Sequence, residues 1–297
     1  ANPDLTLAEA KEQALAIINK TARDLKKKTG VHQSADKIFA EAEISALEGG
    51  LAKVAKEQKD LAEARAQGLL FDDFEQIGPQ GGSNVGALYQ SKVDGQKYYI
   101  KAPDNEVQAK VEILSSKLYQ MAGVRTADVS PIKLKGTIGR TDVDGRLGIA
   151  SKIEDVKDLD EEAIAALKDV QDGFAADAWL ANWDVIGNGG PKALNIKQLA
   201  DGSAFRIDTG ATMQFRARGS LKAFPADKVD ELDSLKKTDY SQRLIFGDIG
   251  EAKVVQGVSR IVAIADDDIR KVVKEIMGDD AGDLGVDSIS FANPLFR

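Results

Sequence analysis

Short strand-like runs of hydrophobic and polar residues recur between residues 71 and 208, and at three places an Asp–Gly pair separates two of them. Asp–Gly between two strand-like runs is a strong local signal for a β-hairpin, because its residues tolerate the left-handed backbone that a tight turn requires. The sequence therefore predicts three hairpins, which join 87–92 to 96–102, 137–142 to 147–153, and 193–198 to 203–208.

Helical periodicity fills the intervals between and after these hairpins. Helices are predicted over 106–122 (ended by Gly123), 161–170, 173–183 and 266–277, in a tail that is mainly helical from residue 226. The order is strands with one helix, then helices, then one hairpin, then more helices. This order indicates an α+β fold with two lobes rather than the regular alternation of a parallel α/β sheet.

Residues 1–70 have a different pattern, rich in Ala, Lys, Glu and Leu and without Trp or Tyr. Thr6 and Glu9 form a capping box that opens one predicted helix, and a second helical stretch runs from Ser34 toward Gly68. The apolar positions of the second stretch recur every three or four residues, which is typical of a short coiled-coil seam and of self-association. We favour a helical hairpin instead, because so short a seam is marginally stable alone.

The composition limits the chemistry that the chain can perform. The chain has 297 residues, no Cys and one His, His32. Disulfides, Cys nucleophiles, iron–sulfur clusters, thiolate zinc sites and zinc sites with two His are therefore excluded. A Ser–His–Asp triad is nearly excluded, since His32 lies in a polar helical stretch without an obvious partner. Any catalysis must use Asp, Glu, Lys, Asn and backbone amides.

Charge and hydropathy narrow the range of partners. The 40 basic and 48 acidic residues give a net charge of −8, which argues against a nucleic-acid partner. The apolar runs are too short to span a membrane, and the first twenty residues show no signal-peptide pattern. We therefore expect a cytoplasmic protein with no nucleic-acid or membrane partner; a phage particle or a secreted effector is the alternative.

A cluster of glycines precedes the first predicted hairpin. It comprises Gly78, Gly81, Gly82 and Gly86, which surround Ser83 and Asn84. Glycines let the backbone approach a phosphate group closely and turn its amides toward it. The spacing fits neither the dinucleotide fingerprint nor the Walker loop, and a simple turn is the alternative interpretation.

Five polar residues after this cluster suggest phosphate and metal chemistry. Lys101 ends a strand-like run and Glu112 lies in the next helix; a Lys paired with a carboxylate suits binding of α- and β-phosphates. Asp184 lies where a predicted helix runs into a Gly-rich loop, and Asn195 begins the next predicted strand. These positions suit a general base and a metal ligand. Asp208 ends a strand in Asp-x-Gly, which turns the chain sharply beside a carboxylate. Taken singly, Asp184 also fits a capping or turn role.

The linear order of these features is that of the protein-kinase-like fold. The chain resembles the atypical branch of that superfamily, the HipA-like and phosphatidylinositol-kinase-like proteins, over about residues 75–215. The resemblance is carried by Gly81-Gly82-Ser83-Asn84, Tyr98-Tyr99-Ile100-Lys101, Val111-Glu112-Ile113-Leu114, Asn182-Trp183-Asp184 and Arg206-Ile207-Asp208-Thr209-Gly210. The wider segment 208–222 looks like uncharacterised kinase-like proteins of bacteria and phages.

The resemblance implies a kinase-like N-lobe over 71–155, a C-lobe over 156–297 and a helical extension over 1–70. It implies that ATP and Mg²⁺ are bound: Lys101 would hold the α- and β-phosphates, with Glu112 orienting it. Asp184 would accept or guide the proton of the attacking hydroxyl, and Asn195 and Asp208 would hold Mg²⁺. The other nucleotide contacts implied are the phosphate loop Gly81, Gly82, Ser83 and Asn84, and for adenine the segment 150–154 with Ser151 and Ile153.

The sequence departs from the kinase pattern at three points. Asp184 and Asn195 are eleven residues apart, a longer spacing than usual, so either the loop has an insertion or Asn188 is the ligand. The gap from Asn195 to Asp208 suits one hairpin and favours Asn195. Trp183 replaces the usual basic residue before the catalytic Asp, and no Ala-Pro-Glu motif follows.

These features predict an ATP- and Mg²⁺-dependent phosphotransferase that phosphorylates Ser or Thr of a protein. An enzyme that transfers AMP would use the same fold. The non-enzymatic alternative is a catalytically silent nucleotide-binding scaffold, or a phage structural or effector protein, with residues 1–70 as an arm for self-association or for docking a partner.

Overall fold

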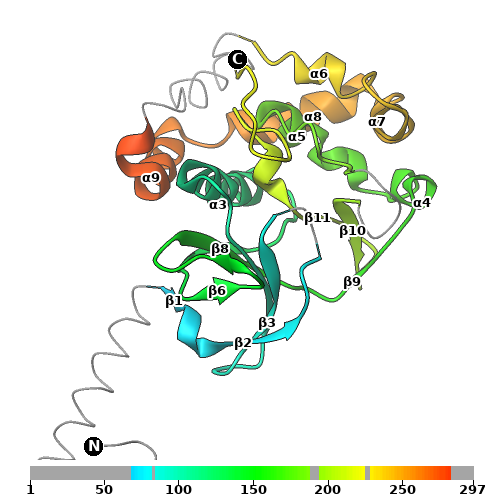
Figure 1. The fold of residues 1–297 in the computed structure, drawn as a ribbon. Coiled ribbons are helices and arrows are strands. Elements are labelled where there is room, and N and C mark those ends of the chain that lie inside the picture. The colour runs from blue at the N-terminus through cyan, green and yellow to red at the C-terminus, as the bar shows by residue number, and fades with distance from the viewer. Residues whose placement is uncertain (1–67, 82–83, 188–193, 225–227, 282–297) are drawn as a thin grey trace, which may run out of the picture. The chain divides into compact units, whose positions relative to one another are not determined.

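The computed structural model describes residues 68–297, except for 82–83, 188–193, 225–227 and 282–297 (Figure 1). The described residues belong to one unit of the chain, Gly68–Arg297. The helical extension predicted over 1–70 falls almost wholly outside the described residues, so it stays a prediction.

One sheet of six strands forms most of the N-terminal half of this unit. Its strands, in spatial order, are β1 (Leu69–Leu70), β5 (Val129–Lys133), β8 (Leu147–Lys152), β4 (Lys97–Lys101), β3 (Gly86–Ser91) and β2 (Phe74–Gly78). All neighbours are antiparallel except β1 and β5. The first predicted hairpin is confirmed as β3 and β4, which are joined at Asp94–Gly95 with Gly95 at φ 74°.

The second predicted hairpin is wrong in its pairing. The run 137–142 does not pair with 147–153: it folds on itself as β6 (Thr137–Ile138) and β7 (Thr141–Asp142). Strand β8 lies instead between β4 and β5, where Ile149 and Ala150 are fully buried. Asp144–Gly145 does turn the chain, but toward β5, because pairing in the middle of the sheet buries both faces of β8 whereas pairing with 137–142 would not.

Helix α3 (Glu106–Met121) is confirmed almost to the residue. The side chain of Asn105 accepts a hydrogen bond from the backbone N–H of Val107 and caps the helix N-terminus. The helix ends before Gly123, whose φ of 72° is costly for residues with a side chain. Both ends were predictable because the capping signals are local.

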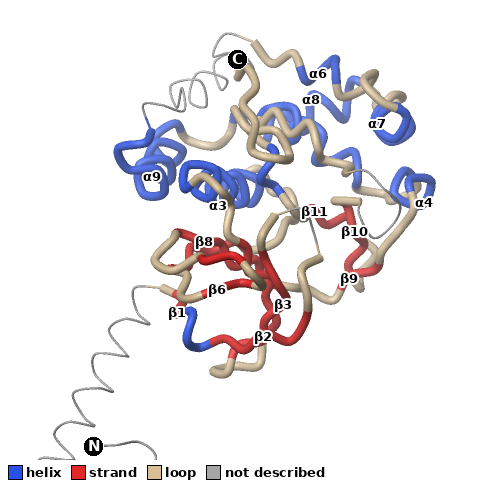
Figure 2. The backbone as a smooth tube through the Cα atoms, in the orientation of Figure 1, coloured by secondary structure: helices blue, strands red, loops and turns tan. Residues whose placement is uncertain are grey.

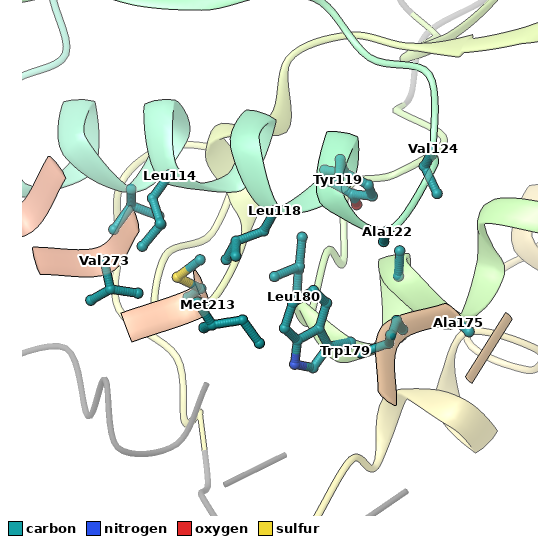
Figure 3. Packing of buried hydrophobic residues seen from close by; sticks show 14 of the residues in the cluster. Leu114, Leu118, Tyr119, Ala122, Val124, Ala175, Trp179, Leu180, Met213 and Val273 are labelled. Atoms are coloured by element: carbon teal, nitrogen blue, oxygen red, sulfur yellow. The ribbon is translucent and has the colours of Figure 1, made fainter. Parts of the chain in front are cut away.

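Helix α3 lies between the sheet and the helices of the C-terminal half. Ala109 and Ile113 pack with β5 and β8 on one side. On the other side Leu114 and Leu118 pack in a cluster that also contains Trp179, Leu180, Met213 and Val273, as Figure 3 shows. Burying each such side chain contributes roughly 1.5–3 kcal/mol. Helix α3 is therefore held by both halves, which fixes the position of Glu112 on it.

The C-terminal half is mainly helical (Figure 2). Its α-helices are α4 (Glu161–Ala165), α5 (Phe174–Trp179), α6 (Glu231–Ser234), α7 (Tyr240–Phe246), α8 (Glu251–Val262) and α9 (Asp266–Met277). The predicted mainly helical tail is confirmed over the described residues 228–281, with α9 at the predicted bounds. Helices α4 and α5 are shorter than predicted: α4 ends at Ala165 and is followed by a 3-10 turn at Val170–Gly173. After α5, Ala181 adopts a left-handed φ of 49° that turns the chain out of the helix.

The third predicted hairpin is confirmed with shorter strands. Strand β10 (Ile196–Leu199) pairs with β11 (Ala204–Arg206), and β9 (Val156–Lys157) pairs with the other edge of β10. A six-stranded sheet with one helix, followed by a helical half that contains this hairpin, is the two-lobed α+β arrangement that the sequence predicted. Within the described residues no helix is long and apolar enough to cross a membrane.

Candidate active site

Lys101 joins three elements at one point. It is the last residue of β4, is 5% exposed, and lies between β3 and β8. Its Nζ is 2.8 Å from Oε1 of Glu112 on α3 and 2.6 Å from Oδ1 of Asp208, which follows β11. The sequence predicted the pair with Glu112; the structure adds the contact with Asp208.

The cluster keeps Lys101 charged. Burial alone would lower the pKa of Lys101, but the carboxylates of Glu112 and Asp208 outweigh burial and raise its pKa above the usual range. Burial raises the pKa of Glu112, the charge of Asp208 adds to this rise, and Lys101 limits it. One ammonium is thus shared by two carboxyl groups, and burial favours the neutral form of Glu112.

Asp208 differs from Glu112 in its access to solvent. The Lys101 ammonium lowers the pKa of Asp208 although burial opposes this, so Asp208 is ionised. Its side chain is 51% exposed, whereas that of Glu112 is 3% exposed. Asp208 also has a left-handed φ of 51°, which costs Asp less than most residues. Glu112 therefore serves as a buried partner of Lys101, while Asp208 remains accessible to a ligand.

Asp184 and Asn195 lie together, as the kinase resemblance requires. The left-handed turn at Ala181 sends the chain from α5 into the loop that carries Asp184. The Nδ2 group of Asn195 donates to the backbone oxygen of Asp184 at 2.8 Å and to its Oδ2 at 3.3 Å. Burial raises the pKa of Asp184 and the nearby charge of Asp208 adds to this, while Asn195 and Lys222 oppose it.

Asn195 and Asp208 occupy the open end of the same hairpin. Ile196 pairs with Arg206 in the sheet, and one residue further out the Ile207 N–H donates to the Asn195 backbone oxygen at 2.9 Å. An amide oxygen and a carboxylate are donors that Mg²⁺ accepts, usually alongside water and phosphate oxygens. The donor types therefore fit Mg²⁺. No cluster of three His, Cys, Asp or Glu side chains suited to a metal occurs within the described ranges, and Asn188 lies outside them.

The predicted phosphate loop is only partly described. The backbone N–H of Gly81 donates to the hydroxyl of Tyr99 at 3.1 Å, and Asn84 is half-buried. Tyr99 and Lys101 share a face of β4, so the loop begins on the face that carries Lys101. Gly82 and Ser83 lie outside the described residues, and their role in binding phosphate stays a prediction.

The predicted adenine segment follows the strand next to Lys101. Ser151 pairs with Tyr99 across β8 and β4. The backbone N–H of Ile153 donates to the Lys97 oxygen at 2.9 Å, and the Ile153 oxygen accepts from Nε2 of Gln96 at 2.8 Å. The backbone N–H of Ile153 is therefore engaged within the protein and is not free to donate to adenine.

Sequence reasoning missed a pair of cations that flank Trp183. Lys222 Nζ lies 4.9 Å and Arg216 Cζ 4.7 Å from the centroid of the Trp183 ring. Lys222 is 8% exposed, and burial lowers its pKa to about 7, with Arg216 adding to the fall and Glu231 and Asp184 opposing it. Periodicity could not reveal this contact because Lys222 lies 39 residues after Trp183.

A buried network behind the site also escaped the sequence analysis. Arg206 on β11 donates from Nε and Nη2 to the two carboxylate oxygens of Asp177 on α5, at 2.7 and 2.6 Å. The Tyr119 hydroxyl on α3 donates to Asp177 at 2.9 Å, and Asn182 Nδ2 donates to that hydroxyl. The only local signal was a charged residue inside the apolar run of β11. The network ties β11, α3 and α5 to the chain that leads into Asp184.

Comparisons with known proteins give distant structural likenesses only. No protein-family model matches the chain, and no curated protein matches it in sequence. The proinflammatory kinase CtkA of Helicobacter pylori is 13% identical, with a TM-score of 0.43, and the match covers 75% of this chain and 90% of CtkA. The choline kinase LicA of Streptococcus pneumoniae is 14% identical, with a TM-score of 0.32, and the match covers 84% of this chain and all of LicA. Both likenesses are too distant to assign an activity or substrate.

Proposed function

We propose that this chain is an ATP- and Mg²⁺-dependent phosphotransferase of the atypical kinase type. The observation that carries the proposal is the position of Lys101, whose Nζ contacts Glu112 of α3 and Asp208 beyond β11 at 2.8 and 2.6 Å. A Lys held by a helix Glu, beside a metal-binding Asp, is the arrangement that orders nucleotide phosphates in kinases.

The charge of the site favours a divalent cation with a nucleotide. Asp208 lies near both Glu112 and Asp184, and the Lys101 ammonium contacts Glu112 and Asp208. Asp208 and Asn195 would hold Mg²⁺, which would supply positive charge that neutralises phosphate oxygens. Lys101 would then bind the α- and β-phosphates as a point charge while Glu112 keeps it oriented.

The proposed reaction transfers the γ-phosphoryl group to a hydroxyl. The acceptor oxygen forms a bond to the γ-phosphorus, the bond from that phosphorus to the β–γ bridging oxygen breaks, and ADP leaves. The acceptor hydroxyl gives up its proton, which Asp184 accepts or guides. Asn195 donates to Oδ2 of Asp184 at 3.3 Å and to the Asp184 backbone oxygen at 2.8 Å, which would hold the carboxylate and its backbone in place for this role.

For the acceptor we propose a Ser or Thr of a protein. Asp184 is partly exposed and its neighbour Trp183 is 40% exposed, which supports access by an acceptor larger than a metabolite. The finer assignment, to HipA-like or phosphatidylinositol-kinase-like enzymes, rests on the sequence motifs. A cytoplasmic location, and docking or self-association through residues 1–70, belong to the same proposal.

The proposal is tested by following two labels. The purified chain is incubated with Mg²⁺ and with ATP labelled at either the γ- or the α-phosphorus, alone and with a mixture of candidate protein acceptors. Label from the γ position should appear on protein or as phosphate. Asp184→Asn should lower this rate by about 10²–10⁴-fold, the range for removal of a general base, and should leave ATP binding intact.

Other outcomes of this assay reject the proposal in distinct ways. Transfer of the α label would make the chain an AMP transferase. Absence of any transfer by the wild-type chain, with ATP still bound, would favour the silent scaffold. Turnover by Asp184→Asn at the wild-type rate would remove Asp184 from the reaction.

Gly210 offers a separate test of the pair between Lys101 and Glu112. A Cβ atom added at Gly210 would lie 2.5 Å from Oε2 of Glu112, so Gly210→Ala should push that carboxylate away from Lys101. We expect kcat/KM for ATP to fall by about 10²-fold, because small displacements of positioning groups carry costs of that size. Gly250→Ala is the control, since a Cβ there meets no atom within 4 Å. Equal kcat/KM values for the two variants would show that the pair does not position the nucleotide.

A further inference from the structure

The segment that follows Asp208 returns to the site as a compact hairpin over residues 214–222. Its two sides are joined by the backbone N–H of Lys222, which donates to the Gln214 oxygen at 2.7 Å, and by a bridge between Phe215 and Leu221. Its turn contains Gly219, at φ 76°. The hairpin therefore delivers the Lys222 side chain from a fixed backbone position.

The Lys222 ammonium connects the two loops that carry the candidate catalytic groups. Its Nζ donates to the backbone oxygen of Ala181 at 2.5 Å and to that of Ala211 at 2.9 Å. Ala181 is three residues before Asp184, and Ala211 is three residues after Asp208. One buried cation thus holds a carbonyl group from each loop.

Further contacts beside this bridge also connect the two loops. Met213, with a left-handed φ of 52°, donates its N–H to the Leu180 oxygen at 2.6 Å and so makes a second link beside the first. The Lys222 ammonium also lies over the Trp183 ring, one residue from Asp184. Burying an ammonium is costly, and the hydrogen bonds to the two carbonyls offset part of that cost.

We propose that Lys222 is a positioning residue that fixes the Asp184 loop relative to the Asp208 loop. The catalytic part of this proposal rests on the proposed function, since the alignment of the loops would set the distance between the proton acceptor and the bound phosphates. Because Lys222 and the hairpin hold this alignment without added groups, the segment after Asp208 needs no phosphorylation to become ordered. That differs from kinases whose activation loops are ordered by new Arg–phosphate pairs.

The kinetic test compares Lys222→Met, Lys222→Arg and a control. Methionine has a similar length and no donor, so it frees both carbonyls without emptying the site. Lys236→Met is the control, because Lys236 also packs its ammonium against an aromatic ring, 5.6 Å from the centroid of Phe174, but contacts neither loop. We expect Lys222→Met to lower kcat for γ-phosphate release about 100-fold, while KM for ATP stays within about threefold of the wild-type value. Lys222→Arg should retain at least a tenth of the wild-type activity. Lys236→Met should match wild type. The proposal would be overturned if kcat of Lys222→Met stayed within threefold of the wild-type value. It would also be overturned if KM for ATP rose by the same factor as kcat fell.

Amide hydrogen exchange tests the inference without turnover. We expect Lys222→Met to speed exchange at least tenfold in segments 181–187 and 209–215, while Lys236→Met leaves both unchanged. Unchanged exchange in either segment would overturn the bridge between the loops. If Lys222→Met does not fold, Lys222→Gln, which keeps a shorter donor, replaces it in both assays. A wild-type chain that neither releases γ-phosphate nor transfers it to protein rejects the proposed function, and exchange then decides the role of Lys222.

Discussion

Replacing Asp208 with Asn is expected to lower turnover about 10³-fold or more and to remove the dependence of ATP binding on Mg²⁺. Asn tolerates the left-handed φ of 51° at this position, so the backbone is retained. The substitution removes the accessible carboxylate of the cluster, while Lys101 keeps its pair with Glu112 at 2.8 Å. Groups that neutralise charge on a transferring phosphoryl group are worth effects of this size.

The matched control for Asp208→Asn is Asp201→Asn, at the opposite end of the same hairpin. Asp201 is exposed and pairs with Arg125 at 2.5 Å, far along the strands from the open end that carries Asn195 and Asp208. Turnover and calorimetric titration of ATP, with Mg²⁺ and with a chelator, should be normal in the control. Turnover of Asp208→Asn within tenfold of wild type would exclude Asp208 as a metal ligand.

The largest expected effect on folding comes from Asp177→Asn. The two side chains have the same shape, so the substitution leaves no cavity, but it leaves the Arg206 guanidinium buried without a counter-charge. Arg206 is 2% exposed and Asp177 is fully buried. Breaking a buried ion pair by removing one partner costs about 3–5 kcal/mol, and we expect the free energy of unfolding in urea to fall by that amount.

Lys135→Ala is the comparison for this loss of stability. Lys135 pairs with Asp72 at 2.8 Å, a distance similar to that between Arg206 and Asp177, but its side chain is 65% exposed and that of Asp72 is 69% exposed. Exposed pairs contribute little, so Lys135→Ala should cost much less than Asp177→Asn. Equal losses would show that the buried network does not stabilise the fold.

The elements that the sequence predicted correctly are those whose signals are local. The Asp94–Gly95 and Asp201–Gly202 turns join neighbouring strands, and α3 begins at the cap Asn105 and ends before Gly123. The prediction at Asp144–Gly145 was wrong because this turn lies in a longer connection between β5 and β8. Burial within the sheet determines the partner of β8, not the run that is nearest in sequence.

The candidate site shows the same division. The linear order of Lys101, Glu112 and Asp208 predicted residues that the fold brings into contact. The roles of Lys222 and Asp177 depend on contacts across 41 and 29 residues, which neither periodicity nor motif spacing encodes. A charged residue within an apolar run, as at Arg206, signals that a buried partner exists but does not identify it.

Thermal unfolding of the wild-type chain with ATP, in the presence and absence of Mg²⁺, tests the central claim most directly. A ligand that binds only the folded state stabilises it by about 2.7 kcal/mol at a concentration of 100 times Kd, so the melting temperature should rise with ATP and Mg²⁺ together. ATP with a chelator, and Mg²⁺ alone, should each give a much smaller rise. An unchanged melting temperature at millimolar Mg²⁺ and ATP would contradict a nucleotide site formed by Lys101, Asn195 and Asp208.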